Sequence, residues 1–182
     1  MRCGQRACAH ARDTPGVPLL IGNLPPGVFH CPEAYTACVI FEMIAIITAG
    51  LFSGAAVYIN VVEQPARLSC GIEAAVTEWR PSYKRATWMQ APLALVGSLS
   101  ALLSWWLNRG SAWLIGGLLL LAVVPFTLVV IMPTNKRLEN SDLDLSSDEA
   151  GRLLRRWGRL HAVRSILSVV AFVVFLLATK IR

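Results

Sequence analysis

Three long stretches of this chain carry no charged side chain, and a fourth, Ser165–Thr179, is charge-free but short, so that a full span there must include His161 and Arg164. These runs restrict the fold more than any other feature of the sequence. A helix needs about 20 apolar residues to cross the roughly 30 Å hydrocarbon core of a bilayer. Inside that core the backbone must satisfy its own hydrogen bonds, which a helix does within one segment. The sequence therefore predicts four membrane-spanning helices, at Met43–Val62, Ala86–Leu107, Gly110–Met132 and Leu160–Thr179.

Composition agrees with a membrane protein. Of the 182 residues, 55% are hydrophobic and 15% are charged, whereas soluble domains carry about 25% charged residues. This argues against an ordinary soluble enzyme and predicts an all-α integral membrane four-helix bundle over residues 34–182. Residues 1–33 have no continuous apolar core, so they are predicted to form a disordered N-terminal extension, whose arginines leave a targeting role open.

The basic residues predict how the bundle is oriented. Seven of the 17 Lys and Arg residues lie between Met132 and Ser165, and four more lie in the predicted loop Glu63–Arg85. Bases beside membrane spans collect on the cytoplasmic side, which places both long loops in the cytoplasm and both termini on the opposite side. This reading of the cluster predicts membrane lipid as a partner and no nucleic acid.

Sequence signatures of a bound metal or cofactor are missing. The five cysteines form no short repeated pair, and the chain has no glycine-rich phosphate loop, paired metal carboxylates or serine-nucleophile elbow. We therefore predict neither a metal site nor a cofactor.

Two parts of the sequence echo each other. In two places, Val62–Leu68 and Met132–Leu138, an apolar run ends and is followed by a proline and then by Arg-Leu. In addition, Trp79 and Trp157 each stand four positions before a ring-bearing polar residue. The echo predicts a two-helix unit used twice in parallel orientation. The alternative is that Pro, Trp and Arg simply collect at membrane interfaces.

Polar side chains recur at helical spacing near the loop end of each predicted span. Residues three or four apart share one face of a helix, and polar groups that face lipid are costly, so we expect these side chains to meet inside the bundle. They are Asn60 and Glu63 on the first helix, Trp79, Tyr83 and Gln90 on the second, Asn135 on the third, and Trp157, His161 and Arg164 on the fourth.

His161 is the one histidine outside the N-terminal extension, and an imidazole is a base near neutral pH. A hydrogen-bonded structural histidine is the alternative. For Arg164 the alternative is snorkelling to the headgroups, and for the tryptophans it is interfacial anchoring. Glu63 and Arg67 stand four apart and are predicted to form a structural ion pair.

From about Gly50 to Leu177, the order and spacing of these residues resemble the anthrone-oxygenase-like family of small four-helix membrane proteins. Some members of this family are associated with oxidising anthrones to anthraquinones. The segments that carry the resemblance are Tyr58–Leu68, Trp79–Ala86, Met89–Gln90, Pro125–Thr127, Met132–Asn135 with Leu138, and Trp157–Arg164.

The resemblance implies an oxygenase that works without flavin, haem or metal on a hydrophobic aromatic molecule and dioxygen. His161 would remove a proton from the central methylene of the substrate, and Arg164 would stabilise the resulting enolate or peroxide. The residues expected to bind the substrate are Asn60, Trp79, Tyr83, Arg85, Gln90, Asn135 and Trp157.

Two other classes of function fit the same sequence. One is a non-catalytic membrane protein that binds lipid or partner proteins, with arginines that suit lipid headgroups. The other is a small carrier, which the internal echo favours and the lack of charge at mid-depth disfavours. Each of these is compatible with a homo-oligomer.

Overall fold

The computed structural model describes residues 32–107 and 109–180, and this part of the chain is helical apart from short connections. The predicted N-terminal extension falls almost entirely on residues 1–31, outside the described residues. The elements are α2 (Pro32–Tyr58), η1 (Ile59–Glu63), α3 (Gln64–Ser69), α4 (Ile72–Trp106), α5 (Ser111–Phe126), η2 (Thr127–Ile131), α6 (Met132–Glu139) and α7 (Asp148–Lys180), where η marks a π-helical segment.

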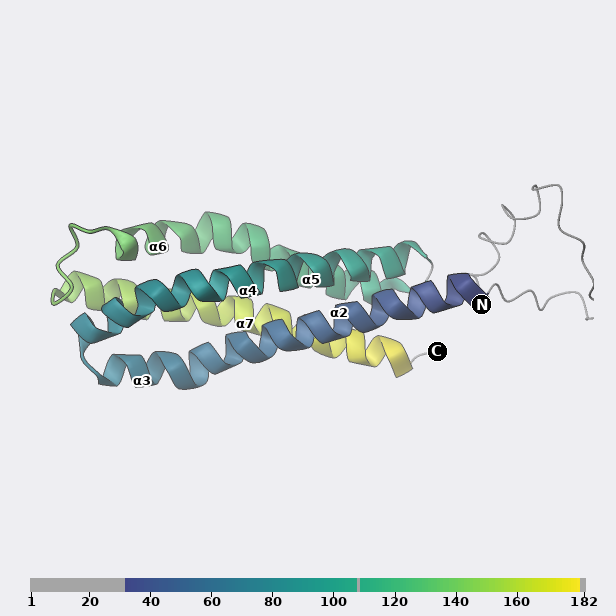
Figure 1. Cartoon of the computed structure of the whole chain (residues 1–182), viewed down its shortest axis with the longest axis horizontal. Helices are drawn as coiled ribbons and strands as arrows, with labels where there is room; N and C mark the ends of the chain where they lie inside the picture. Colours follow the sequence, from purple (N-terminus) through teal and green to yellow (C-terminus); the bar gives the residue numbers. More distant parts are fainter. Residues whose placement is uncertain (1–31, 108, 181–182) are drawn as a thin grey trace, which may run out of the picture.

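These elements join end to end into four long rods that lie side by side (Figure 1). The rod of α2 packs against α4 and α7, and α5 packs against the same two helices, which closes a four-helix bundle. All four rods are long and apolar enough to cross a membrane. The prediction of an all-α, multi-pass membrane bundle is therefore confirmed, and α2 begins at the same end of the bundle at which α7 ends.

The helices are longer than the predicted spans. The first rod, Thr36–Ser69, has 34 residues, which is about 51 Å at 1.5 Å per residue and exceeds the hydrocarbon core. Most of the predicted loop Glu63–Arg85 is helical, so that loop was wrong in this respect. In Pro133–Arg164, the capping-box spacing from Ser146 to Glu149 predicts the start of a helix that runs into the last span, and α7 indeed begins at Asp148. A charge-free run marks the part of a helix that faces lipid, whereas the Glu, Lys, Arg and Ala residues that flank it continue the helix into water.

The sequence echo corresponds to a repeated backbone feature. Both α2 and α5 pass into a π-helical segment, and both segments are followed by a short helix with proline in its first turn, Pro65 in α3 and Pro133 in α6. Segments of this kind widen a helix locally and are frequent at functional sites. The bundle thus contains the same irregularity twice, at one depth on its loop side.

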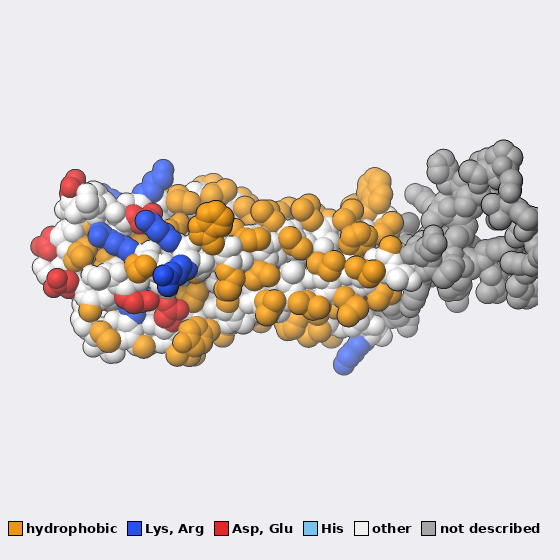
Figure 2. Space-filling view, in the orientation of Figure 1, with side chains coloured by type: hydrophobic (Ala, Val, Ile, Leu, Met, Phe, Trp, Pro, Cys, Tyr) orange, Lys and Arg blue, Asp and Glu red, His pale blue; other side chains and the backbone are white. Residues whose placement is uncertain are grey.

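Charged side chains gather at one end of the bundle, around α3 and α6, and hydrophobic side chains dominate the face beyond them (Figure 2). The core is divided in the same way. One buried cluster fills the apolar part around Phe52, Trp113 and Phe175, and another fills the charged end around Trp79 and Trp157. Buried polar side chains such as Gln90, Asn135 and His161 line a cavity at the charged end, and they belong to the candidate site.

Candidate functional site

A small, partly enclosed cavity lies inside the bundle at the level of the two π-helical segments. Its volume is about 20 Å³, which is room for roughly one water molecule. All four rods contribute to its wall. The lining residues are Ile59, Glu63, Arg67, Trp79, Ser82, Tyr83, Ala86, Thr87, Gln90, Ile131, Asn135, Trp157, His161 and Arg164.

His161 is buried, and Asn60 contacts its imidazole ring. The amide Nδ2 of Asn60 donates to the carbonyl of Gly158 at 2.9 Å, so its Oδ1 faces the imidazole. That oxygen accepts from the Ser165 hydroxyl at 2.7 Å and lies 2.6 Å from His161 Nδ1. Because an amide oxygen cannot donate, Nδ1 carries the proton, and in the neutral ring the lone pair is on Nε2. Nε2 makes no hydrogen bond to any described residue.

Arg164 brings a guanidinium to the same cavity. Its Nη2 donates to Gln90 Oε1 at 2.7 Å, and its Cζ lies 5.2 Å from the centre of the Phe52 ring, in cation–π range. Among the described residues no carboxylate forms an ion pair with it. A cation without a counter-ion inside a membrane protein is costly, so this position favours an anionic ligand.

Several enclosed polar atoms around the cavity have unused hydrogen-bonding capacity. Trp79, Asn135 and Gln90 are at most 2% exposed, and unpaired buried polar groups are uncommon in folded proteins. Most of these atoms are donors, so the wall suits a ligand rich in acceptor oxygens. The atoms without a partner among the described residues are Trp79 Nε1, Gln90 Nε2, Asn135 Nδ2, Asn135 Oδ1 and Arg164 Nε.

Aromatic rings form the opposite part of the wall. Trp79 and Tyr83 stack at 4.9 Å with an angle of 4° between their planes, and Trp157 meets Trp79 edge-on at 5.6 Å. His161 follows Trp157 at 4.8 Å, so each tryptophan contacts the ring four residues further along its own helix. A flat aromatic ligand matches rings arranged in this way.

Arg67 has partners that Arg164 lacks. It forms ion pairs with Glu63 and with Glu78, and its Nη1 donates to Gln64 Oε1 at 3.1 Å. Glu63 in turn accepts from the Ser82 hydroxyl at 2.7 Å. The predicted Glu63–Arg67 pair is therefore present, and Glu78 and Ser82 extend it across the turn between α3 and α4.

The structure brings together most of the residues that the sequence singled out, but two of them lie elsewhere. Asn60 contacts His161 without lining the cavity. Arg85 is exposed and lines a separate groove between α2 and α4. Helical spacing also places Ser165, four residues after His161, on the same polar face, and the structure adds that Ser165 shares Asn60 with the imidazole.

Among the described residues, no three His, Cys, Asp or Glu side chains gather closely enough to hold a metal ion. The polar groups of the cavity are instead one imidazole, guanidinium groups, amides, hydroxyls, one indole N–H and the ion-paired Glu63 carboxylate. Such a wall can accept one proton and stabilise negative charge on oxygen.

Comparison with known proteins points to one family. Residues 79–174, more than half of the chain, match the family model described as anthrone oxygenase. The chain is 28% identical over 145 residues to the anthrone oxygenase tpcL of Aspergillus fumigatus, and this match covers 74% of the chain and 90% of the relative. No solved structure matches the chain. The family match includes His161, Arg164 and Asn135, and it begins after Asn60 and Arg67.

Proposed function

The chain belongs to the anthrone oxygenase family, and we propose that it is a membrane-embedded oxygenase that converts the activated methylene of a phenolic tricyclic ketone into a carbonyl. One observation carries the proposal. Nε2 of His161 has no hydrogen-bond partner among the described residues, and His161 lines the same small cavity as Arg164, whose guanidinium forms no ion pair with a described carboxylate. A base beside a fixed cation is what removal of a proton from carbon requires, because the electron pair left behind needs stabilisation.

The reaction balances with dioxygen as the oxidant. Nε2 of His161 takes one proton from the methylene, and the carbanion, delocalised onto the ring ketone, transfers electrons to dioxygen and forms a carbon–oxygen bond. The resulting peroxide takes the proton back from the imidazolium. Loss of the second methylene hydrogen with cleavage of the oxygen–oxygen bond then gives the new carbonyl and water. The methylene and one O2 thus become one carbonyl and one H2O, with the electrons supplied by the substrate.

The other residues of the cavity have positioning roles in this proposal. Asn60 and Ser165 hold the imidazole so that Nδ1 is protonated and Nε2 is the base. Arg164, with the amide of Asn135, faces the oxygen on which negative charge accumulates. The ring of Tyr83, which stacks on the buried Trp79, offers a flat face to the fused rings of the substrate.

A tricyclic substrate does not fit a cavity of about 20 Å³, so the bundle must open to admit it. An open groove of about 690 Å³ lies between α2 and α4 and shares Ile59, Glu63, Ser82 and Ala86 with the cavity wall. We infer that a hydrophobic substrate passes from the lipid through this groove. Ile59 and Glu63 belong to the π-helical segment η1, whose irregular hydrogen bonding makes it suited to movement.

The direct test is oxygen consumption by the purified full chain in detergent with a dihydroxyanthrone as the substrate. We expect the quinone to appear with one O2 consumed per molecule and without release of hydrogen peroxide, faster than the autoxidation of the same anthrone in empty micelles. A rate equal to that background for a set of hydroxylated anthrones would contradict the proposed activity.

We also propose that the charged end of the bundle faces the cytoplasm, as its excess of basic residues indicates. Cys70 provides the test, because it is exposed in the turn between α3 and α4, whereas Cys38 is buried. A variant that keeps Cys70 as its one cysteine should react with a membrane-impermeant maleimide after the cells are opened and not in intact cells. Labelling in intact cells would reverse the orientation.

A further inference from the structure

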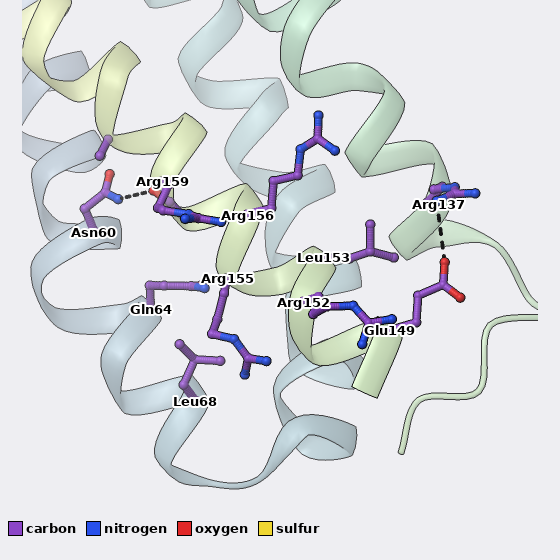
Figure 3. Close-up of a pocket in the computed structure, with 12 residues that line it drawn as sticks. Asn60, Gln64, Leu68, Arg137, Glu149, Arg152, Leu153, Arg155, Arg156 and Arg159 are labelled. Carbon is purple, nitrogen blue, oxygen red and sulfur yellow. Dashed lines mark hydrogen bonds and ion pairs between the residues drawn. The ribbon is translucent and has the colours of Figure 1, made fainter. Parts of the chain in front are cut away.

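A second, larger site lies on the outside of the bundle, away from the small cavity. It is an open groove of about 860 Å³ at the charged end, between α3 and α7 (Figure 3). Gln64 and Leu68 of α3 form one wall, and Asn60 closes the end nearest the apolar part of the bundle. Five arginines line it, namely Arg137, Arg152, Arg155, Arg156 and Arg159.

The arginines of this groove are poorly neutralised. Arg137 pairs with Glu149 at 3.6 Å. The other four are exposed, and none forms an ion pair with a carboxylate among the described residues. These four belong to α7 and fall within an arc of about 100° on the helix, since successive residues are separated by roughly 100°. Four guanidinium groups therefore extend from one side of α7, and Figure 3 shows that Arg155 and Arg156 reach in different directions from it.

The groove also continues into the part of the bundle that faces lipid. Ala162 lies at its inner end. One turn further into the apolar region, Ile166 follows Ala162 on the same face of α7. Val57, near the end of α2, stands three residues before Asn60 of η1. The side chains of Ile166 and Val57 are 63% and 39% exposed. A ligand that occupies the whole groove therefore meets positive charge at one end and exposed hydrocarbon at the other.

We propose that this groove binds an anionic phospholipid whose headgroup carries more than one phosphate. A guanidinium presents a planar pair of donors that matches the oxygens of a phosphate. If each guanidinium donates two hydrogen bonds, one phosphate cannot bind all four unpaired arginines, whereas two phosphates can. The acyl chains then follow the apolar faces of α2 and α7. This inference does not depend on the proposed oxygenase activity.

A general preference for basic residues at the cytoplasmic surface does not account for this arrangement, because such a preference acts around the whole bundle. Lys84 and Lys136 are exposed bases at the same end, and neither lines the groove. They supply a matched control, since replacing both with glutamine removes the same formal charge as replacing two arginines of the groove.

The experiment is native mass spectrometry of the full chain in a neutral detergent, with phosphatidylcholine, phosphatidylglycerol or cardiolipin added. We expect cardiolipin, which has two phosphates, to bind more tightly than the other two lipids. Each basic residue near an anionic lipid is worth about fivefold in affinity. Arg155→Gln with Arg159→Gln should therefore weaken cardiolipin binding roughly ten- to thirtyfold, and Lys84→Gln with Lys136→Gln less than threefold.

Three outcomes would overturn the proposal. Equal losses in the two double variants would show that net charge, and not the groove, attracts the lipid. Equal affinity for the three lipids would remove the role of the phosphates. Complete displacement of cardiolipin by inorganic pyrophosphate at the same molar concentration would identify a site for a soluble anion, because the acyl chains would then contribute nothing.

Discussion

Replacing His161 with glutamine should abolish turnover of an anthrone while leaving the protein folded in the membrane. Glutamine can still donate to Asn60 Oδ1, which keeps the interior hydrogen bond. It cannot accept a proton near neutral pH, and loss of a general base typically lowers a rate by about 10²–10⁴-fold. The measurement is oxygen uptake per molecule of purified protein, with the temperature of unfolding as a check on the fold.

Ser168→Ala provides the matched control for this variant. Ser168 is buried on the same helix two turns beyond His161, and its hydroxyl bonds to the carbonyl of Ser165 at 2.9 Å without lining the cavity. We expect its loss to change the rate by less than about threefold, since no group near the substrate is altered. An active His161→Gln protein would reject the imidazole as the base, whatever the control shows.

The architecture was accessible from the sequence because hydrophobic length is a strong signal. Three full-length charge-free runs and one shorter run predict four helices, and the structure has four helices long and apolar enough to cross a membrane. The helix ends were not accessible in this way. Residues such as Glu73, Glu78 and Arg80 end a hydrophobic run but favour helix, so α4 begins at Ile72, more than three turns before its predicted span. The chain turns instead at Gly71, whose φ of 89° favours glycine.

The candidate site was accessible only in part, since helical spacing gives the face of a residue and not its partner. Spacing placed Trp79, Tyr83 and Gln90 on one face, and all three line the cavity. It could not tell that Gln90 bonds to Arg164, or that Arg85 turns outward to a different groove. Those outcomes depend on the rotation of α4 against α2 and α7, which is set by packing between helices and not by any one helix.

Arg67 and Arg164, the arginines that line the cavity, offer the sharpest separation of function from stability. Arg67 is 6% exposed and is paired with Glu63 and Glu78, whereas Arg164 has no carboxylate among the described residues. A protein keeps a costly, unpaired cation beside a cavity when its function needs that charge. We therefore expect replacement with methionine to lower activity without lowering stability at Arg164, and to lower stability at Arg67.

Arg164→Met should therefore lower kcat/KM for an anthrone by about 10²–10³-fold, the usual effect of removing a group that stabilises an oxyanion, while the temperature of unfolding stays level or rises. Arg67→Met should lower that temperature, because it leaves Glu63 inside the bundle without its cation. The free energy of unfolding should fall by on the order of 1–3 kcal/mol, a moderate loss because the second partner, Glu78, is half exposed and its ion pair with Arg67 is screened by water. Arg164→Lys should retain part of the activity, because it keeps the charge and loses the planar fork. If Arg164→Met instead unfolded at a temperature as low as Arg67→Met, the guanidinium would hold the bundle together, and its assignment to the oxyanion would be wrong.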